Sequence, residues 1–125
     1  MTLISILIPC YNEEENIRAC HARVSKVLDR LEGIKAEIIF TDNHSTDLTF
    51  AILREIAEED PRVRVFRFSR NVGYQNSVMF AYKAARGDCA IQLDSDLQDP
   101  PELIPKMLDL WRQGNQVVYG IRRSL

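Results

Sequence analysis

The sequence predicts a single α/β domain, a mostly parallel sheet with helices on both faces, and three observations support this fold class. The first is the length, since 125 residues suit one domain. The second is the alternation of short apolar strands with longer helical patterns, which is typical of parallel sheets covered on both faces. The third is that polar and acidic residues collect where the strands end. In such sheets, ligands bind beyond the carboxyl ends of the strands.

The predicted strands are short apolar runs that end in turn residues. We expect four of them at 3–8, 36–41, 63–68 and 89–93, and a fifth at 116–119. In the third strand, apolar side chains interleave with arginines. That alternation favours a more exposed position in the sheet.

The segments between the strands have the spacing of amphipathic helices. We expect helices at about 13–31, 48–58, 74–85 and 102–113. His21 lies among polar neighbours on the first of these helices and is expected to be solvated. The apolar positions of the third helix predict that its inward face carries Val78, Ala81, Tyr82 and Ala85.

The composition excludes several classes of protein. A net charge of -2 gives no reason to expect a nucleic-acid partner. Cys10, Cys20 and Cys89 are odd in number and widely spaced, which argues against a zinc site or a disulfide framework and fits a reducing cytosol. The apolar start lacks a basic region and contains Pro9, so it is predicted to be a strand rather than a signal peptide. No apolar run reaches the ~18 residues of a membrane span.

The stretch after the fourth predicted strand carries the clearest chemistry. Asp94 and Asp96 are one residue apart at a strand end, so their side chains point the same way. Two carboxylates that close repel each other unless a cation or a shared proton lies between them. Mg2+ or Mn2+ suits oxygen ligands, and Gln98 could add a carbonyl oxygen. The alternative is a helix cap, but Asp99 already supplies one, with Glu102 three residues later.

Residues at the other strand ends each have a simple structural interpretation. Tyr11 and Asn12 suit a turn, Asp42 and Ser45 suit loop and cap bonding, and Gly73 suits a positive φ angle. Taken together, polar residues at five strand ends on one edge of one sheet favour a binding site.

Four segments of the chain resemble a known family. They are 8–14 (Ile-Pro-Cys-Tyr-Asn-Glu-Glu), 41–47 (Thr-Asp-Asn-His-Ser-Thr-Asp), 70–73 (Arg-Asn-Val-Gly) and 93–102 (Leu-Asp-Ser-Asp-Leu-Gln-Asp-Pro-Pro-Glu). In this order they are similar to the family 2 inverting glycosyltransferases, and most of all to the polyprenyl-phosphate and dolichyl-phosphate sugar transferases. The resemblance implies the GT-A fold. It makes residues 1–125 the nucleotide-sugar-binding half of a longer GT-A domain.

The resemblance also implies roles for individual residues. Those that hold or shape the nucleotide pocket are Pro9, Tyr11, Glu13, Asp42, Asn71, Gly73 and Asp94. Those that bind Mg2+ or Mn2+ are Asp94, Asp96 and Gln98. Those that meet phosphate are Arg122 and its neighbour Arg123.

The activity that the resemblance implies is transfer of a sugar, with inversion, from a UDP- or GDP-sugar to a polyprenyl or dolichyl phosphate for cell envelope polysaccharide. The metal would neutralise charge on the leaving diphosphate. The protein is expected to be cytoplasmic, and a lipid acceptor would place the full-length protein at the cytoplasmic face of the membrane. A homo-oligomer is compatible with the resemblance.

The catalytic base is not assigned to any residue of this sequence. In the family, the base and the acceptor-binding parts follow residues like Arg122, so the resemblance places the base beyond Leu125. We therefore expect residues 1–125 alone to bind the donor without turnover.

Other functions fit the residues less well, apart from a nucleotide-sugar-binding module without turnover, which stays open. A phosphohydrolase would use Asp94 as nucleophile, but its motif normally lies on the first strand, with Thr or Val where Gln98 stands. A dinucleotide-binding dehydrogenase needs a glycine-rich turn after the first strand. A signalling receiver domain needs an acidic pair there, where Pro9 and Cys10 stand.

The sequence departs from the glycosyltransferase pattern in one loop. Family members usually have Asp-Asp-Gly-Ser where this chain has Asp-Asn-His-Ser at 42–45, so the loop is less acidic and less flexible.

Overall fold

The fold is described by a computed structural model that covers residues 2–96, 98 and 100–118. Within these residues, no helix has both the length and the apolar character needed to cross a bilayer. The elements follow one another as β1 (Thr2–Cys10), α1 (Ile17–Asp29), β2 (Ile34–Asp42), α2 (Thr49–Glu59), β3 (Val63–Arg67), α3 (Tyr74–Ala84), β4 (Cys89–Gln92), the 3-10 helix η1 (Pro101–Leu103) and α4 (Ile104–Arg112).

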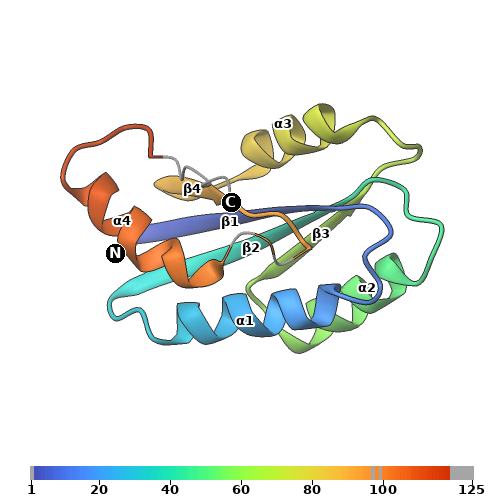
Figure 1. The fold of residues 1–125 in the computed structure, drawn as a ribbon, viewed down its shortest axis with the longest axis horizontal. Coiled ribbons are helices and arrows are strands. Elements are labelled where there is room, and N and C mark those ends of the chain that lie inside the picture. Colours follow the sequence, from blue (N-terminus) through green and yellow to red (C-terminus); the bar gives the residue numbers. More distant parts are fainter. Residues whose placement is uncertain (1, 97, 99, 119–125) are drawn as a thin grey trace, which may run out of the picture.

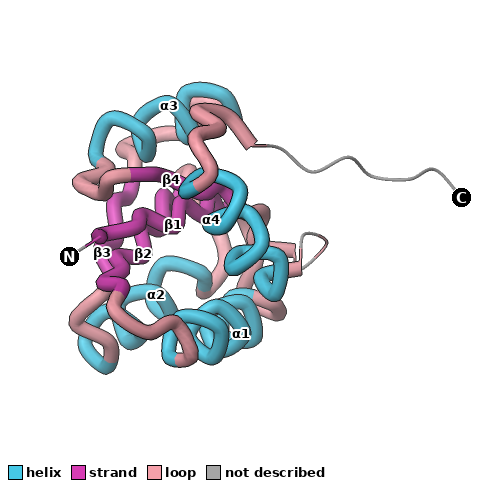
Figure 2. The backbone as a smooth tube through the Cα atoms, turned by 90° about the vertical axis from the view of Figure 1, so that its left-hand side faces the viewer, coloured by secondary structure: helices cyan, strands magenta, loops and turns pink. Residues whose placement is uncertain are grey.

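The four strands form a parallel sheet in the order β3-β2-β1-β4. Figure 1 and Figure 2 show α3 on one face of this sheet and α1 and α2 on the other, and the buried core places α4 on the side of α1 and α2. The predicted α/β class is therefore confirmed. β3 lies at one edge, in the more exposed position that its alternating arginines predict.

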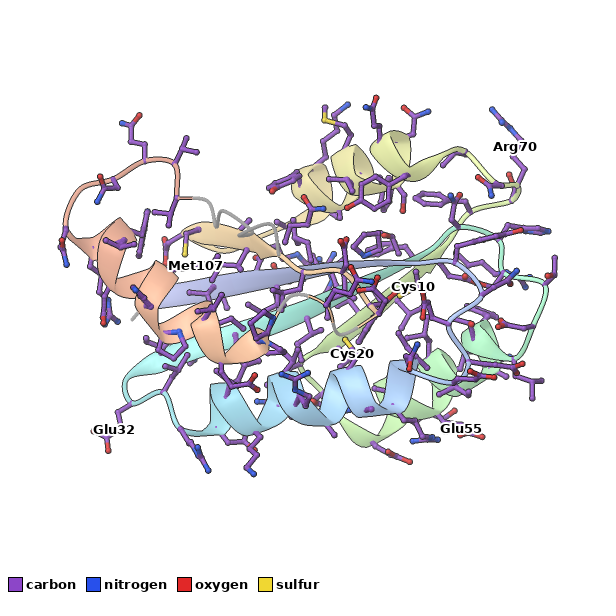
Figure 3. All side chains as sticks on the ribbon, viewed as in Figure 1. Cys10, Cys20, Glu32, Glu55, Arg70 and Met107 are labelled. Atoms are coloured by element: carbon purple, nitrogen blue, oxygen red, sulfur yellow. The ribbon has the colours of Figure 1, made fainter. Side chains whose placement is uncertain are left out.

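The side chains of β1 explain why the sheet is covered on both faces. Ile4, Ile6 and Ile8 belong to the core shared with α1, α2 and α4, whereas Leu7 packs with Ala81 of α3, and all five side chains are fully buried. Burying each large aliphatic side chain stabilises the fold by about 1.5–3 kcal/mol. Figure 3 shows side chains filling the space between α1 and the sheet. This packing holds the carboxyl ends of the strands in place.

Some expected elements differ from the structure. Residues 116–118 form no strand, and Val117 is 79% exposed, because they pair with no strand of the described part of the chain. Tyr119 lies outside the described residues. The expected inward position of Tyr82 is wrong, since this side chain is 46% exposed and the buried positions of α3 are Ser77 and Ala81.

The expectation that His21 is solvated is also wrong. Its Nε2 lies 2.9 Å from Asp60 Oδ2 and 3.2 Å from Ser25 Oγ, and only 17% of the side chain is exposed. Arg62 donates to both carboxylate oxygens of Asp60 at 3.0 Å. This cluster ties α1 to the turn between α2 and β3. Sequence neighbours on a helix cannot reveal such a partner, because Asp60 is 39 residues away.

Candidate functional site

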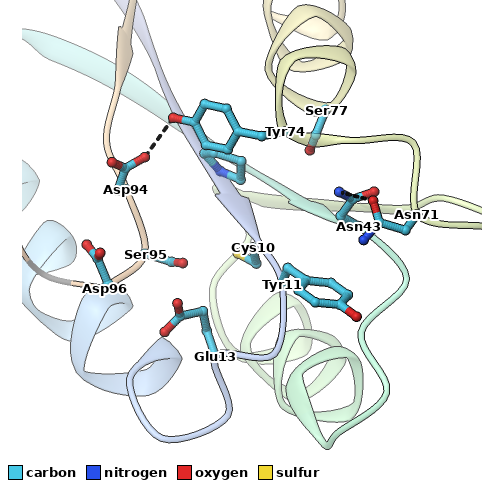
Figure 4. A pocket seen from close by; sticks show the side chains of 11 residues that line it. Cys10, Tyr11, Glu13, Asn43, Asn71, Tyr74, Ser77, Asp94, Ser95 and Asp96 are labelled. Atoms are coloured by element: carbon cyan, nitrogen blue, oxygen red, sulfur yellow. Dashed lines mark hydrogen bonds between the residues drawn. The ribbon is translucent and has the colours of Figure 1, made fainter.

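A pocket of about 390 Å3 lies beyond the carboxyl ends of β1, β2 and β4 (Figure 4). Loops after all four strands and the first turn of α3 contribute to its wall. The lining residues are Pro9, Cys10, Tyr11, Glu13, Asn43, Asn71, Tyr74, Ser77, Asp94, Ser95 and Asp96. Of the residues that the sequence assigns to a site, the structure brings together Pro9, Tyr11, Glu13, Asn71, Asp94 and Asp96.

Carboxylates line one side of this pocket. Asp94 and Asp96 lie in the loop after β4, and Glu13 comes from the loop after β1 (Figure 4). Gln98 is exposed and is not among the residues that line the pocket. Its backbone N–H donates to Asp96 Oδ1 at 3.1 Å. The residues described here include no cluster of three or more His, Cys, Asp or Glu side chains that could hold a metal ion. Two carboxylates suit an ion that takes its other ligands from water and substrate phosphate, as Mg2+ commonly does.

A network of amides forms the side of the pocket nearest β2 and β3. Asn71 Oδ1 accepts hydrogen bonds from Asn43 Nδ2 and from the backbone N–H of Gly73, both at 2.9 Å. Asn43 Oδ1 accepts the backbone N–H of Val72 at 2.8 Å. Gly73 has a φ of 87°, which favours glycine, and α3 begins at the next residue. Gly73 does not line the pocket, and its predicted role in shaping it stays a prediction.

Asp42 lies outside the pocket wall and is completely buried. Its Oδ1 accepts the backbone N–H and the hydroxyl of Ser45, at 3.1 and 2.5 Å. Its Oδ2 lies 3.5 Å from Arg67 Nε and has no hydrogen-bond donor among the described residues. The charge of this carboxylate is therefore compensated by Arg67, while Oδ2 keeps room for a hydrogen-bond donor.

The loops after β1 and β2 are tied together. Asn12 accepts the backbone N–H of Thr46 at 2.8 Å and donates its own N–H to Ser45 Oγ at 2.9 Å. Asn12 and His44 have φ angles of 50° and 60°, in the left-handed region. His44 occupies the position of the glycine in the Asp-Asp-Gly-Ser pattern that the resemblance implies. Its Nδ1–H donates a hydrogen bond to the carbonyl of Phe68 at 3.1 Å. These contacts hold the rim of the pocket in one arrangement.

Some pocket residues are not singled out by the sequence. They are Cys10, Tyr74, Ser77 and Ser95. Asn43 lines the pocket from the 42–45 loop, which the resemblance already relates to the pocket. The spacing of Tyr74 and Ser77 at i and i+3 could have found them, because both lie on one face of a helix that starts at the ligand-binding edge. Burial and then the nearby Cys20 raise the pKa of the Cys10 thiol well above its ordinary value, so this thiol stays protonated at neutral pH.

Part of the predicted site cannot be compared with the structure. Arg122 and Arg123, predicted to meet phosphate, lie outside the described residues, as does Asp99, the predicted helix cap. Leu125, beyond which the catalytic base is expected, also lies outside them. The phosphate-binding role of the arginines and the location of the base therefore stay predictions.

A parallel α/β sheet with an acidic pocket beyond the carboxyl ends of its strands is typical of a class of domains that bind ligands at that place. Within that class, the chain belongs to glycosyl transferase family 2, whose family model matches residues 5–124. It is 41% identical over 118 residues to an uncharacterized glycosyltransferase, YkcC, of Bacillus subtilis (strain 168), covering 94% of this chain and 36% of that protein. It is 34% identical over 119 residues to a dolichol-phosphate mannosyltransferase of Pyrococcus furiosus, covering 95% and 33%. The chain thus spans about a third of these relatives.

Solved structures agree on the fold. Glucosyl-3-phosphoglycerate synthase from Mycobacterium tuberculosis, in complex with UDP, matches 90% of this chain and 41% of its own, with a TM-score of 0.70 and 26% identity. A mannosyltransferase from Pyrobaculum calidifontis, in complex with GDP-Man and Mn2+, matches 78% and 32%, with a TM-score of 0.66 and 23% identity. The GT-A fold that the sequence predicts is therefore confirmed.

Proposed function

We propose that the pocket binds the nucleotide diphosphate of a UDP- or GDP-sugar, and that the protein transfers this sugar with inversion. The observation that carries the proposal is the division of the pocket into two sides. Carboxylates of Asp94 and Asp96 lie on one side, and Tyr11 with the Asn43–Asn71 amide pair lies on the other (Figure 4). A diphosphate with its cation suits the first side, and a planar base with several donors and acceptors suits the second.

A buried hydrogen-bond acceptor, the carboxylate of Asp42, lies next to the side of the pocket that is proposed to hold the base. Asp42 is paired with Cys10 in the β1–β2 register, and Cys10 lines the pocket. The Oδ2 atom of Asp42 lacks a hydrogen-bond donor among the described residues. Uracil and guanine both carry ring N–H groups that could satisfy this oxygen after a small shift of the wall. We assign Asp42 to recognition of the base and not to the metal.

Asp94 and Asp96 would hold Mg2+ or Mn2+, with phosphate oxygens and water as the remaining ligands. When bound, such an ion neutralises charge that develops on the leaving diphosphate. Gln98 stays a proposed ligand of this ion. Its backbone bond to Asp96 already orders the loop that carries both groups. Arg122 and Arg123 are proposed to share the contact with phosphate.

A polyprenyl or dolichyl phosphate is the proposed acceptor. The support is the name of the Pyrococcus relative, a dolichol-phosphate mannosyltransferase. The chemistry is consistent, because a lipid phosphate is already anionic and needs little help from a general base to attack the sugar. Such an acceptor would bring the whole protein to the cytoplasmic face of a membrane.

Calorimetry of UDP and GDP binding, with and without Mn2+, tests this function. We expect Mn2+ to strengthen binding of the preferred nucleotide at least about tenfold, which is about 1.4 kcal/mol. The variant Asp96→Ala should lose most of that enhancement. A matched control is Asp109→Ala, which removes the same charge at an exposed position of α4 and should keep it. A nucleotide affinity that changes neither with Mn2+ nor in the Asp96→Ala variant would contradict the proposal.

A further inference from the structure

A short chain of hydrogen bonds crosses one wall of the pocket. Tyr74 is the first residue of α3, and its hydroxyl donates to Asp94 Oδ1 at 2.8 Å. Gln92, the last residue of β4, donates from Nε2 to the same hydroxyl at 2.6 Å. Figure 4 shows the tyrosine ring reaching from α3 toward the carboxylate of Asp94.

The direction of this chain is fixed by the chemistry of its members. An amide NH2 can only donate, so the Tyr74 oxygen must accept from Gln92. The single hydroxyl proton then points at Asp94, whose carboxylate can only accept. The carboxylate therefore receives a donor whose direction is set in advance.

We propose that Tyr74 is a positioning residue that orients the carboxylate of Asp94 toward the donor nucleotide or its cation, with Gln92 as its support. This inference rests on the proposed function. It explains why a helix residue that is 54% exposed directs its polar end into the pocket. The neighbouring carboxylate of Asp96 accepts the backbone N–H of Gln98.

The variant Tyr74→Phe tests this role because it removes only the hydroxyl. We expect the affinity for UDP or GDP in the presence of Mn2+ to fall about three- to tenfold, the range for one lost hydrogen bond. The matched control is Tyr82→Phe, on the same helix, 46% exposed and outside the pocket wall, which should bind like the wild type. Gln92→Met removes the support and should weaken binding in the same direction by a smaller factor.

A double-mutant cycle separates positioning from general damage to α3. If Tyr74 acts through Asp94, Tyr74→Phe should change affinity by less than about twofold in an Asp94→Ala background. Equal losses in both backgrounds would overturn the inference, and so would wild-type affinity in Tyr74→Phe. The wild-type titration comes first. If the wild type binds neither UDP nor GDP, the proposed function is wrong, and this inference is wrong with it. If the wild type binds, the variants test the inference alone. Urea unfolding of each variant checks that the fold is retained.

Discussion

Replacing Asn43 by aspartate tests whether the amide network sets the shape of the pocket. Asn43→Asp preserves the size of the side chain and the acceptor for the Val72 N–H. It places an oxygen where the Nδ2 donor stands, 2.9 Å from Asn71 Oδ1. Asn71 cannot relieve this by turning its own amide, because the Gly73 N–H needs the same oxygen at 2.9 Å. The substitution therefore sets two acceptors against each other.

The expected cost follows from burial and from the lost bond. Asn43 is 6% exposed, so water cannot readily reach the new oxygen at this position. A buried acceptor that faces another acceptor and has no donor costs about 1–3 kcal/mol. In a domain of this length, each kcal/mol lowers Tm by roughly 3–6 °C. We expect the free energy of unfolding of Asn43→Asp to be lower than that of the wild type by about 1–3 kcal/mol.

Urea denaturation followed by circular dichroism measures this change. The control is Gln75→Glu, which makes the same amide-to-carboxylate change at an exposed position of α3 and should stay within about 0.5 kcal/mol of the wild type. If Asn43→Asp is as stable as this control, the network does not hold the wall of the pocket in the way described.

Two further predictions concern carboxylates away from the pocket wall. Burial alone would raise the pKa of Asp60, but hydrogen bonds from Arg62 and His21 outweigh it and hold this pKa well below its ordinary value. A depressed pKa gives stability above the unfolded value, about 4, that is lost as the pH falls below it. Urea denaturation between about pH 5 and pH 2 should therefore show a shallower loss of stability in Asp60→Asn than in the wild type, and parallel curves would refute this. Asp42→Ala should weaken binding of the nucleotide while Mn2+ still enhances the remaining affinity, and unchanged affinity in calorimetry would remove Asp42 from base recognition.

The fold could be predicted because its strands carry their signal locally. β1 is a nearly continuous apolar run, and the buried centre of β2 carries the apolar run 38–40, which is what burial on both faces requires. Pairing is the part that local pattern cannot supply. β1 extends to Cys10 because it pairs with β2 up to Asp42, whereas residues 116–118 have apolar character but no partner in the described sheet. The sequence alone does not distinguish these two cases.

The candidate site could be predicted in part for a similar reason. Parallel topology brings the strand ends to one edge, so the positions of Tyr11, Asp94 and Asp96 in the chain suffice to group them correctly. The sequence could not separate Asp94, which lines the pocket, from Asp42, which is buried beside it, because both are aspartates that end or follow a strand. Nor could it find the bond between Tyr74 and Asp94, which lie 20 residues apart on different elements.

The location of a bound nucleotide tests the central claim most directly. A crystal structure of the chain with Mn2+ and UDP or GDP, with anomalous scattering used to locate manganese, gives this location. The account predicts a manganese peak at coordination distance from a carboxylate oxygen of Asp94 or Asp96 and from a phosphate oxygen. It also predicts that the base lies against Tyr11 and Asn71. A nucleotide bound elsewhere on the molecule, or a manganese ion that contacts neither aspartate, would contradict it.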